Sequence, residues 1–167
     1  IIAAGYKKEI ITNYFKKNKF KDWKIKVVDT GLNTMTGGRL KRLKKYLKNE
    51  DFLVTYGDGL SNVNIKKLVS FHKKNKKIVT LTAVRPPARF GVIKISNKEV
   101  KYFKEKSSLD EGWINGGFFV MSKKVFDYLK SDSTYLERKP FEELSKKKQL
   151  LAFKHTGKWF CMDTKRD

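Results

Sequence analysis

The chain has 167 residues and a formal net charge of +22 at pH 7, from 39 basic and 17 acidic side chains. This length is sufficient for one domain with a hydrophobic core. No apolar run approaches the about 20 residues of a membrane-spanning helix, so we predict no membrane insertion. A single cysteine, Cys161, excludes an internal disulfide and a zinc site built from several cysteines, and we expect a cytoplasmic protein.

The charge alone is typical of proteins that bind nucleic acid or an anionic membrane. However, only six of the basic residues are arginines, and the lysines are scattered in short runs along the whole chain. Nucleic-acid readers favour arginine, because its planar fork matches phosphate and guanine. We therefore predict a lysine-rich solvated surface and expect no nucleic-acid partner. A basic nucleic-acid-binding module remains the alternative from another functional class.

In chain order, apolar spacing predicts alternating strands and helices. A strand at residues 1–4 and a helix at 6–17 come first, followed by a strand at 23–28 and a helix around 40–47. A nearly continuous apolar run at 52–56 predicts a buried parallel strand. The later elements are a helix at 62–74, a strand at 78–84, a hairpin at 90–95 and 100–103, a strand at 118–121, helices at 123–130 and 141–148, a strand at 150–153 and a short segment at 159–162.

This alternation predicts an α/β fold, a Rossmann-like, mostly parallel sheet flanked by helices, with a β-hairpin insertion. We find no linker and no internal repeat, and we predict one domain over residues 1–167. The chain starts directly with an apolar strand and without a methionine. We therefore expect a domain that is truncated at both ends.

The first candidate site residue is Asp58, which lies between two glycines after the apolar run at 52–56. Ligands of open α/β sheets bind beyond the carboxyl ends of the strands. A carboxylate there suits Mg²⁺, which takes one or two carboxylates together with substrate phosphates. Asp163 follows a short aromatic segment and is the natural second carboxylate if the chain returns to the same edge. An ordinary Asp-Gly turn and a helix cap are the alternatives.

Further candidates lie in short glycine or lysine motifs. Gly37, Gly38 and Arg39 open a helix, and the free N–H groups of a helix start attract anions. A threonine N-cap and a solvated basic helix start explain the same residues. Lys106 could bind a phosphate as a point charge, although it is one lysine among many. Three residues before a buried strand could let a sugar approach the backbone, or could form a bulge: Asn115, Gly116 and Gly117.

Three other residues are predicted to be structural. His72 and His155 are isolated, and no spacing of serine, histidine and aspartate suggests a hydrolase triad. Cys161 follows Phe160 and is predicted to be a small buried residue.

The order of these motifs resembles that of the sugar nucleotidylyltransferases, and most closely the glucose-1-phosphate cytidylyltransferases. The similarity extends from residue 1 to residue 167. An arginine after the glycine pair fits the cytidylyl branch, where other branches have a small residue. The segments that match are 28–31, 34–42, 55–59, 89–91, 114–119 and 162–164.

The resemblance implies transfer of a cytidylyl group from CTP to α-D-glucose 1-phosphate, which gives CDP-glucose and pyrophosphate. It implies Mg²⁺ as the cofactor, in-line attack on the α-phosphorus, and a homo-oligomer for the full-length enzyme. CDP-glucose usually serves the synthesis of surface polysaccharides such as O-antigen. The roles implied by position are Mg²⁺ ligands for Asp58 and Asp163, nucleotide contacts for Thr34, Gly37, Gly38 and Arg39, a sugar-phosphate contact for Lys106, and proximity to the sugar for Asn115, Gly116 and Gly117.

Two departures from the family pattern matter. The superfamily's Glu-Lys-Pro is Glu-Lys-Ser here, with Lys106 at its centre. The family's glycine-rich triphosphate loop and the lysine that follows it do not occur in these residues. We therefore expect the 167-residue chain by itself to be inactive. The family's first strand is also missing, which should leave an unpaired position and an exposed apolar face in the sheet, so we expect poor solubility.

Two related enzyme classes are alternatives. Another sugar-1-phosphate nucleotidylyltransferase would use dTTP or UTP in place of CTP. A nucleotide-sugar-dependent glycosyltransferase usually holds its metal with Asp-x-Asp, and Asp58 has no second aspartate two residues away.

Overall fold

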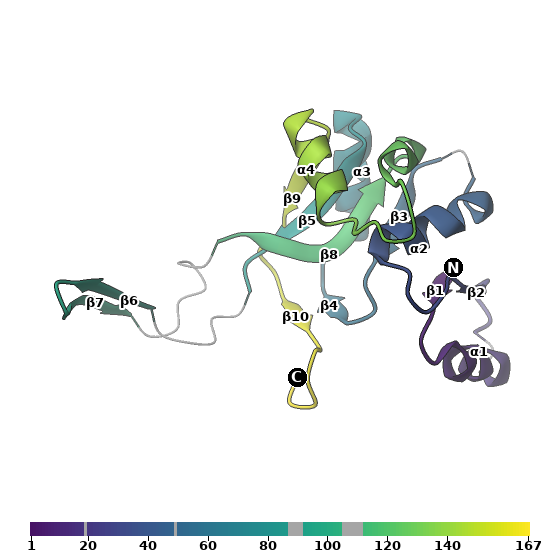
Figure 1. Cartoon of the computed structure of the whole chain (residues 1–167), viewed down its shortest axis with the longest axis horizontal. Helices are drawn as coiled ribbons and strands as arrows, with labels where there is room; N and C mark the ends of the chain where they lie inside the picture. Colours follow the sequence, from purple (N-terminus) through teal and green to yellow (C-terminus); the bar gives the residue numbers. More distant parts are fainter. Residues whose placement is uncertain (19, 49, 87–91, 105–111) are drawn as a thin grey trace. The chain divides into compact units, whose positions relative to one another are not determined.

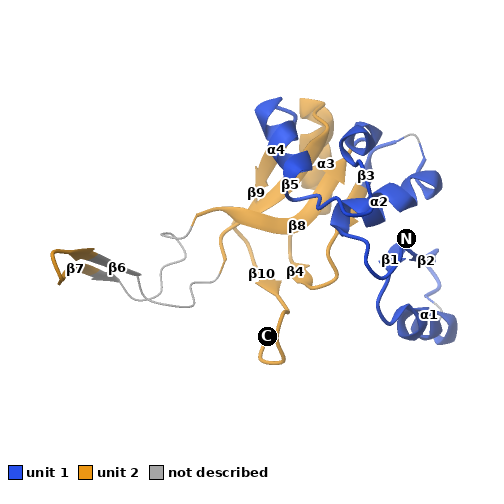
Figure 2. Cartoon of the chain, in the orientation of Figure 1, with its two compact units in different colours: residues 1–52, 122–149 blue, residues 53–121, 150–167 orange. Residues whose placement is uncertain are grey.

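The computed structural model describes residues 1–18, 20–48, 50–86, 92–104 and 112–167, which form two compact units. The first unit comprises residues 1–52 and 122–149, and the second comprises residues 53–121 and 150–167 (Figure 2). Each unit is built from two separate stretches of the chain. Within the described residues, every helix is too short or too polar to cross a membrane.

The first unit contains a small parallel β-ladder and most of the helices. Strand β1 (Ile2–Ala4) pairs in parallel with β2 (Val27–Asp29), and helix α1 (Lys8–Lys17) connects them. The other helices are α2 (Thr36–Leu43), the 3₁₀ helices η1 (Lys44–Tyr46) and η2 (Lys123–Tyr128), and α4 (Lys139–Lys146). Buried apolar side chains from these elements form its core, among them Leu40, Leu43, Val125, Phe126, Leu129, Leu136 and Leu144.

The second unit is organised around a sheet in the order β3-β8-β5-β9 (Figure 1). Its strands are β3 (Phe52–Thr55), β5 (Val79–Val84), β8 (Ile114–Met121) and β9 (Leu150–Lys154). Strand β5 is central, and five of its six residues are buried. Helix α3 (Ile65–Asn75) packs against β5 and β8, and it begins at Asn64, whose side chain accepts a hydrogen bond from the Lys67 N–H at 2.9 Å.

A bulge in β8 shapes the middle of this sheet. Leu81 of β5 pairs with Phe119, but Ala83 pairs with Asn115, so residues 116–118 face the single residue Thr82. Gly117 adopts a positive φ of 77°, which a glycine tolerates without steric cost. The alternative structural interpretation of the Asn-Gly-Gly motif, a bulge, is therefore what the structure contains.

Two short antiparallel ladders complete the second unit. Strand β4 (Gly59–Ser61) pairs with β10 (Trp159–Cys161), and β6 (Val92–Ser96) pairs with β7 (Glu99–Lys104) as the predicted hairpin. Strand β4 was not expected from the sequence, because three residues between glycine-rich turns carry no clear period. Its pairing with β10 brings the residues of the candidate site together.

The predicted α/β class is confirmed, and the sheets are mixed. The β1–β2 and β5–β9 pairs are parallel, whereas β5–β8, β4–β10 and β6–β7 are antiparallel. The strand predicted at residues 52–56 is confirmed at Phe52–Thr55, but the prediction that it is buried is wrong. Strand β3 is at an edge of its sheet in the described part of the chain, and Leu53 is 54% exposed. The predicted helix at 123–130 is a 3₁₀ helix over Lys123–Tyr128.

Candidate functional site

The β4–β10 ladder brings two distant acidic residues together. Cys161 is opposite Gly59, and the Met162 N–H donates to the Asp58 carbonyl oxygen at 2.9 Å, one step beyond the ladder. Asp163 is the next residue in the chain. Asp58 and Asp163, which are about 100 residues apart in the sequence, are thus neighbours at one end of this ladder. The predicted return of the chain to the Asp58 edge is what the structure contains.

The side chains of this cluster converge. One carboxylate oxygen of Asp58, one of Asp163 and the Cys161 Sγ all lie within 4.8 Å of one another. Both carboxylates are exposed, and Cys161 is half-buried. We refer to these three residues as the acidic thiol cluster. Hard oxygen donors at this spacing fit a divalent cation, and substrate phosphates can fill the open side.

No lysine or arginine of the described residues forms an ion pair with either carboxylate of the cluster. This is unexpected in a chain with 39 basic side chains. Two neighbouring carboxylates repel each other, and a bound cation removes that repulsion. The donor set and its negative charge therefore fit a metal ion.

The thiol of Cys161 belongs to this cluster, which corrects the prediction of a small buried residue. Its Sγ donates to the Asp163 Oδ1 at 3.2 Å. This hydrogen bond, partial burial and the negative charges of Asp163 and Asp58 raise the pKa of Cys161 to about 11. The signal for this contact in the sequence is the spacing Cys-x-Asp, which places both side chains on one side of an extended segment.

The glycines next to Asp58 are less constrained than expected. Neither Gly57 nor Gly59 has a positive φ, so the Asp58 turn does not require glycine conformations. A Cβ at Gly57 would meet none of the described residues within 4 Å, so this glycine is not required for packing against them.

The Asn115–Gly117 segment lies beside the strands that lead to the cluster. The Trp159 Nε1–H donates to the Gly116 carbonyl oxygen at 2.8 Å, and the Tyr56 N–H donates to the Gly117 carbonyl oxygen at 3.2 Å. Asn115 Oδ1 accepts from the Gly117 N–H at 3.0 Å, which fixes the turn. A Cβ at Gly116 would lie 2.8 Å from Val84 Cγ1, so this glycine is required for packing.

The start of α2, in the first unit, differs from the predicted anion site. The Gly37 and Gly38 N–H groups donate to the Thr134 carbonyl oxygen at 2.9 and 3.2 Å, and the Met35 N–H donates to Asp132 at 2.8 Å. The N–H groups predicted to attract an anion are thus already bonded to a loop. A Cβ on Gly38 would lie 2.4 Å from the Asp132 carbonyl oxygen, so close packing explains this glycine.

The side chains predicted to contact the nucleotide are also engaged within the first unit. The Arg39 guanidinium donates to the Thr30 Oγ1 at 2.8 Å, to the Leu32 carbonyl oxygen at 3.2 Å and to the Ala4 carbonyl oxygen at 3.3 Å. Thr34 is 5% exposed. The Arg39 side chain therefore holds the loop that precedes Thr34 in place.

Two acidic residues of the first unit contrast with the cluster, because each is paired. Asp132 accepts from Arg42 at 2.6 and 2.9 Å, and this hydrogen bond lowers the pKa of Asp132. Asp29 accepts from Lys8 at 2.5 Å and from the Gly31 N–H at 2.9 Å, and these bonds lower the pKa of Asp29.

The remaining predicted residues either lie outside the described residues or have partners away from the acidic thiol cluster. Lys106 lies outside the described residues, as do residues 89–91 of the motif comparison. His72 is buried, and its Nδ1 is 2.8 Å from the Thr80 Oγ1, in line with the predicted structural role. His155 Nε2 is 3.1 Å from the Asn62 Oδ1.

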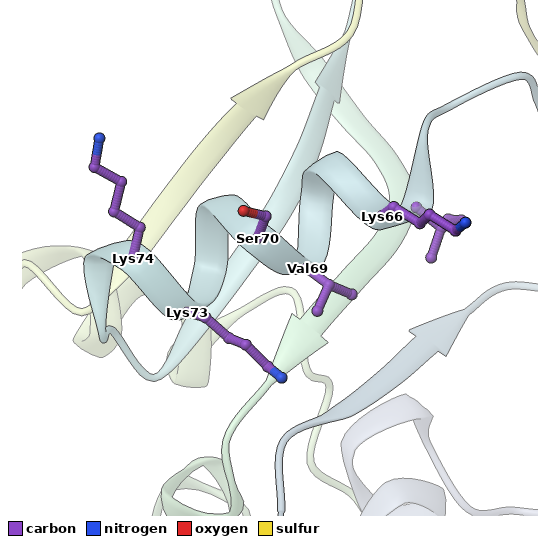
Figure 3. Close-up of a pocket in the computed structure, with 6 residues that line it drawn as sticks. Lys66, Val69, Ser70, Lys73 and Lys74 are labelled. Carbon is purple, nitrogen blue, oxygen red and sulfur yellow. The ribbon is translucent and has the colours of Figure 1, made fainter.

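A hollow of about 700 Å³ lies along α3, and none of its lining residues is a predicted site residue. It is lined by Ile65, Lys66, Val69, Ser70, Lys73 and Lys74. Figure 3 shows its three lysines pointing in different directions away from the helix. Because they do not converge on one point, this surface provides no binding constellation.

Comparison with known proteins supports the sequence interpretation. The nucleotidyl transferase family matches residues 1–163. The chain is 41% identical to the glucose-1-phosphate cytidylyltransferase of Salmonella typhi over its whole length, which covers 74% of that enzyme. It is 38% identical to a probable glucose-1-phosphate cytidylyltransferase of Bacillus subtilis, with 98% of this chain and 72% of that protein covered.

Solved structures show the same fold at lower identity. HddC from Yersinia pseudotuberculosis, complexed with GMP-PN, superposes with a TM-score of 0.71 at 21% identity, covering 98% of this chain and 72% of HddC. A UDP-glucose pyrophosphorylase complexed with UDP-glucose gives a TM-score of 0.65 at 19% identity, with coverage of 95% and 73%. The chain therefore belongs to the nucleotidyl transferase family, among its glucose-1-phosphate cytidylyltransferases.

Proposed function

We propose that this protein transfers a cytidylyl group from CTP to α-D-glucose 1-phosphate and releases pyrophosphate. Family membership supports the reaction class. The observation on which the proposal depends is the meeting of Asp58 and Asp163 without a basic partner among the described residues. We propose these two carboxylates as the ligands of the divalent cation, Mg²⁺ in the working enzyme.

The proposed reaction is a direct displacement. A phosphate oxygen of the sugar phosphate forms a bond to the α-phosphorus of CTP, and the bond from that phosphorus to the bridging oxygen of pyrophosphate breaks. No covalent enzyme intermediate is required, so the protein contributes positioning and charge neutralisation. When bound, Mg²⁺ neutralises negative charge on the phosphate oxygens. Asp58 and Asp163 would hold the cation, and the space at Gly57 among the described residues would leave room for the substrate beside it.

The other roles are proposed from the motifs that this chain shares with the family. We propose that Asn115, Gly116 and Gly117 present the bulged backbone of β8 to the sugar, and that Lys106 binds its phosphate. Thr34, Gly37, Gly38 and Arg39 form the proposed nucleotide segment, in which Arg39 acts by holding the preceding loop. We also propose that the enzyme works in the cytoplasm as a homo-oligomer.

The experiment uses protein expressed from the complete gene. Pyrophosphate release is measured with glucose 1-phosphate and Mg²⁺, and with CTP, UTP, dTTP, ATP or GTP in turn. We expect CTP to be the preferred nucleotide. Asp58→Asn and Asp163→Asn should each lower kcat by a factor of about 10² to 10³, because each removes a carboxylate from the cation that stabilises the transition state.

Asp167→Asn is the matched control, since it makes the same charge change four residues beyond Asp163 and should retain the rate. Thermal unfolding of each variant shows whether its fold is intact. Preference for dTTP or UTP would keep the chemistry and move the protein to another branch. Full activity in Asp58→Asn would refute the proposed site.

A further inference from the structure

We infer that Cys161 is a third donor to the divalent cation proposed at Asp58 and Asp163, which gives this site a preference for thiophilic cations such as Zn²⁺ and Co²⁺ over Mg²⁺. The inference deepens the proposed function and rests on it for the presence of a cation at the two carboxylates. It adds Cys161, a side chain to which the proposed function assigns no role.

The geometry places the sulfur where a metal donor must be. Sγ and one oxygen of each carboxylate lie within 4.8 Å of one another, and Sγ is 3.2 Å from the Asp163 Oδ1. A tetrahedral ion at about 2.0–2.3 Å from its ligands separates them by roughly 3.5 Å. The three atoms therefore need only small side-chain shifts to surround one ion.

The backbone holds the thiol in this position. Cys161 is the last residue of β10, where it pairs with Gly59, and the Met162 N–H bond to the Asp58 carbonyl oxygen follows at once. Both sides of the cluster are thus tied to one ladder. A rotation of Cys161 about its Cα–Cβ bond moves the sulfur without moving the two carboxylates.

The donor chemistry decides which ions benefit. Two carboxylates and water suit Mg²⁺, which prefers hard oxygen ligands. A sulfur donor adds little affinity for Mg²⁺. It favours the softer ions Zn²⁺ and Co²⁺, whose affinity for sites with mixed nitrogen, oxygen and sulfur donors already exceeds that of Mn²⁺. The charge supports cation binding independently of the sulfur, because no basic side chain in the described ranges is paired with either carboxylate.

The test is a spectroscopic titration of the protein from the complete gene, without a histidine tag, with Co²⁺ under anaerobic conditions. When Co²⁺ binds to Sγ, the S–H bond breaks and the proton is released to the buffer, so we expect a near-ultraviolet thiolate-to-cobalt absorption band that saturates at one ion per chain. The 167 residues contain one cysteine, so Cys161→Ser assigns the band. This variant should lose the band and bind Co²⁺ and Zn²⁺ at least 10-fold more weakly.

The carboxylate variants separate a shared site from a thiol that binds alone. Asp58→Asn and Asp163→Asn should each weaken Co²⁺ binding about 10-fold or more, whereas Asp167→Asn should keep the band and the affinity. Three results would each overturn the inference: no band in the native protein, equal Co²⁺ affinity in Cys161→Ser, or an unchanged titration in both carboxylate variants.

A parallel assay with CTP and Mg²⁺ keeps the two proposals distinguishable. Activity without the cobalt band leaves the proposed function standing and refutes the role of Cys161. The band without nucleotidyl transfer refutes the proposed reaction and leaves the cation site with its sulfur donor.

Discussion

One site in each compact unit shows how differently acidic side chains are placed. At the start of α2, Arg39, Arg42 and Asp132 all have partners, and even the helix N–H groups are bonded to a loop. At the end of β10, Asp58 and Asp163 lie close together without a basic partner among the described residues. A paired acidic group stabilises the local fold, whereas two neighbouring carboxylates repel each other, which favours the binding of a cation.

A pair of glycine substitutions gives the largest expected change in stability. Gly38→Ala should lower the free energy of unfolding by about 1–3 kcal/mol, because its Cβ would lie 2.4 Å from the Asp132 carbonyl oxygen. Gly57→Ala is the control in the other unit. Its Cβ meets nothing within 4 Å and its φ is not positive, so it should be neutral or stabilising by up to about 1 kcal/mol.

Urea unfolding of both variants measures this contrast. An unchanged free energy of unfolding in Gly38→Ala would show that this glycine is not required for packing. A large loss of CTP-dependent rate in Gly57→Ala at unchanged stability would sharpen the comparison, since it would place a substrate at that open backbone.

A smaller effect is expected for Arg39→Lys. The guanidinium serves three acceptors, which a single ammonium group cannot reach together. We expect a loss of about 1–2 kcal/mol in the free energy of unfolding. Chemical denaturation and the KM for CTP are measured together. Unchanged stability with a raised KM would indicate direct contact with the nucleotide, contrary to the positioning function described here.

The smallest effect concerns pH. The hydrogen bond from Arg42 lowers the pKa of Asp132 below 3.8, so this pair contributes stability above the unfolded-state pKa and loses it as the pH falls through the folded-state pKa. Asp132→Asn should therefore lower Tm slightly at pH 7, and the difference from the native protein should disappear in acid. Both groups are exposed, so salt should reduce the difference.

Thermal unfolding between pH 7 and pH 2 measures that difference, with Asp127→Asn as the control for the charge change. A Tm difference that grows as the pH falls would contradict the assigned direction of the shift.

The local pattern of apolar and capping residues predicted most of the helices and strands, because the residues that determine each element are close to one another in the sequence. Helix α3 and its Asn64 cap are an example. The pairing of β4 with β10 could not be predicted in the same way, since the two strands are about 100 residues apart and three residues long. The family resemblance supplied the pairing of Asp58 with Asp163 that local pattern lacked.

The same limit explains the errors. Cys161 is next to an aromatic residue, which suggested burial, but its environment is set by the distant Asp58 segment. The N–H groups of Gly37 and Gly38 also have distant partners, because they donate to the Thr134 carbonyl oxygen. The nucleotide contact of these two glycines stays a prediction. Residues whose partners are distant in sequence are those for which sequence reasoning fails.

The two hydrogen bonds to the bulge of β8 have a mechanical consequence. The Gly116 carbonyl oxygen holds Trp159, which precedes Asp163 by four residues, and the Gly117 carbonyl oxygen holds Tyr56, which precedes Asp58 by two. Both carboxylates are therefore linked through short stretches of chain to the same bulge. A substitution that moved the bulge would act on the positions of both acidic groups at once.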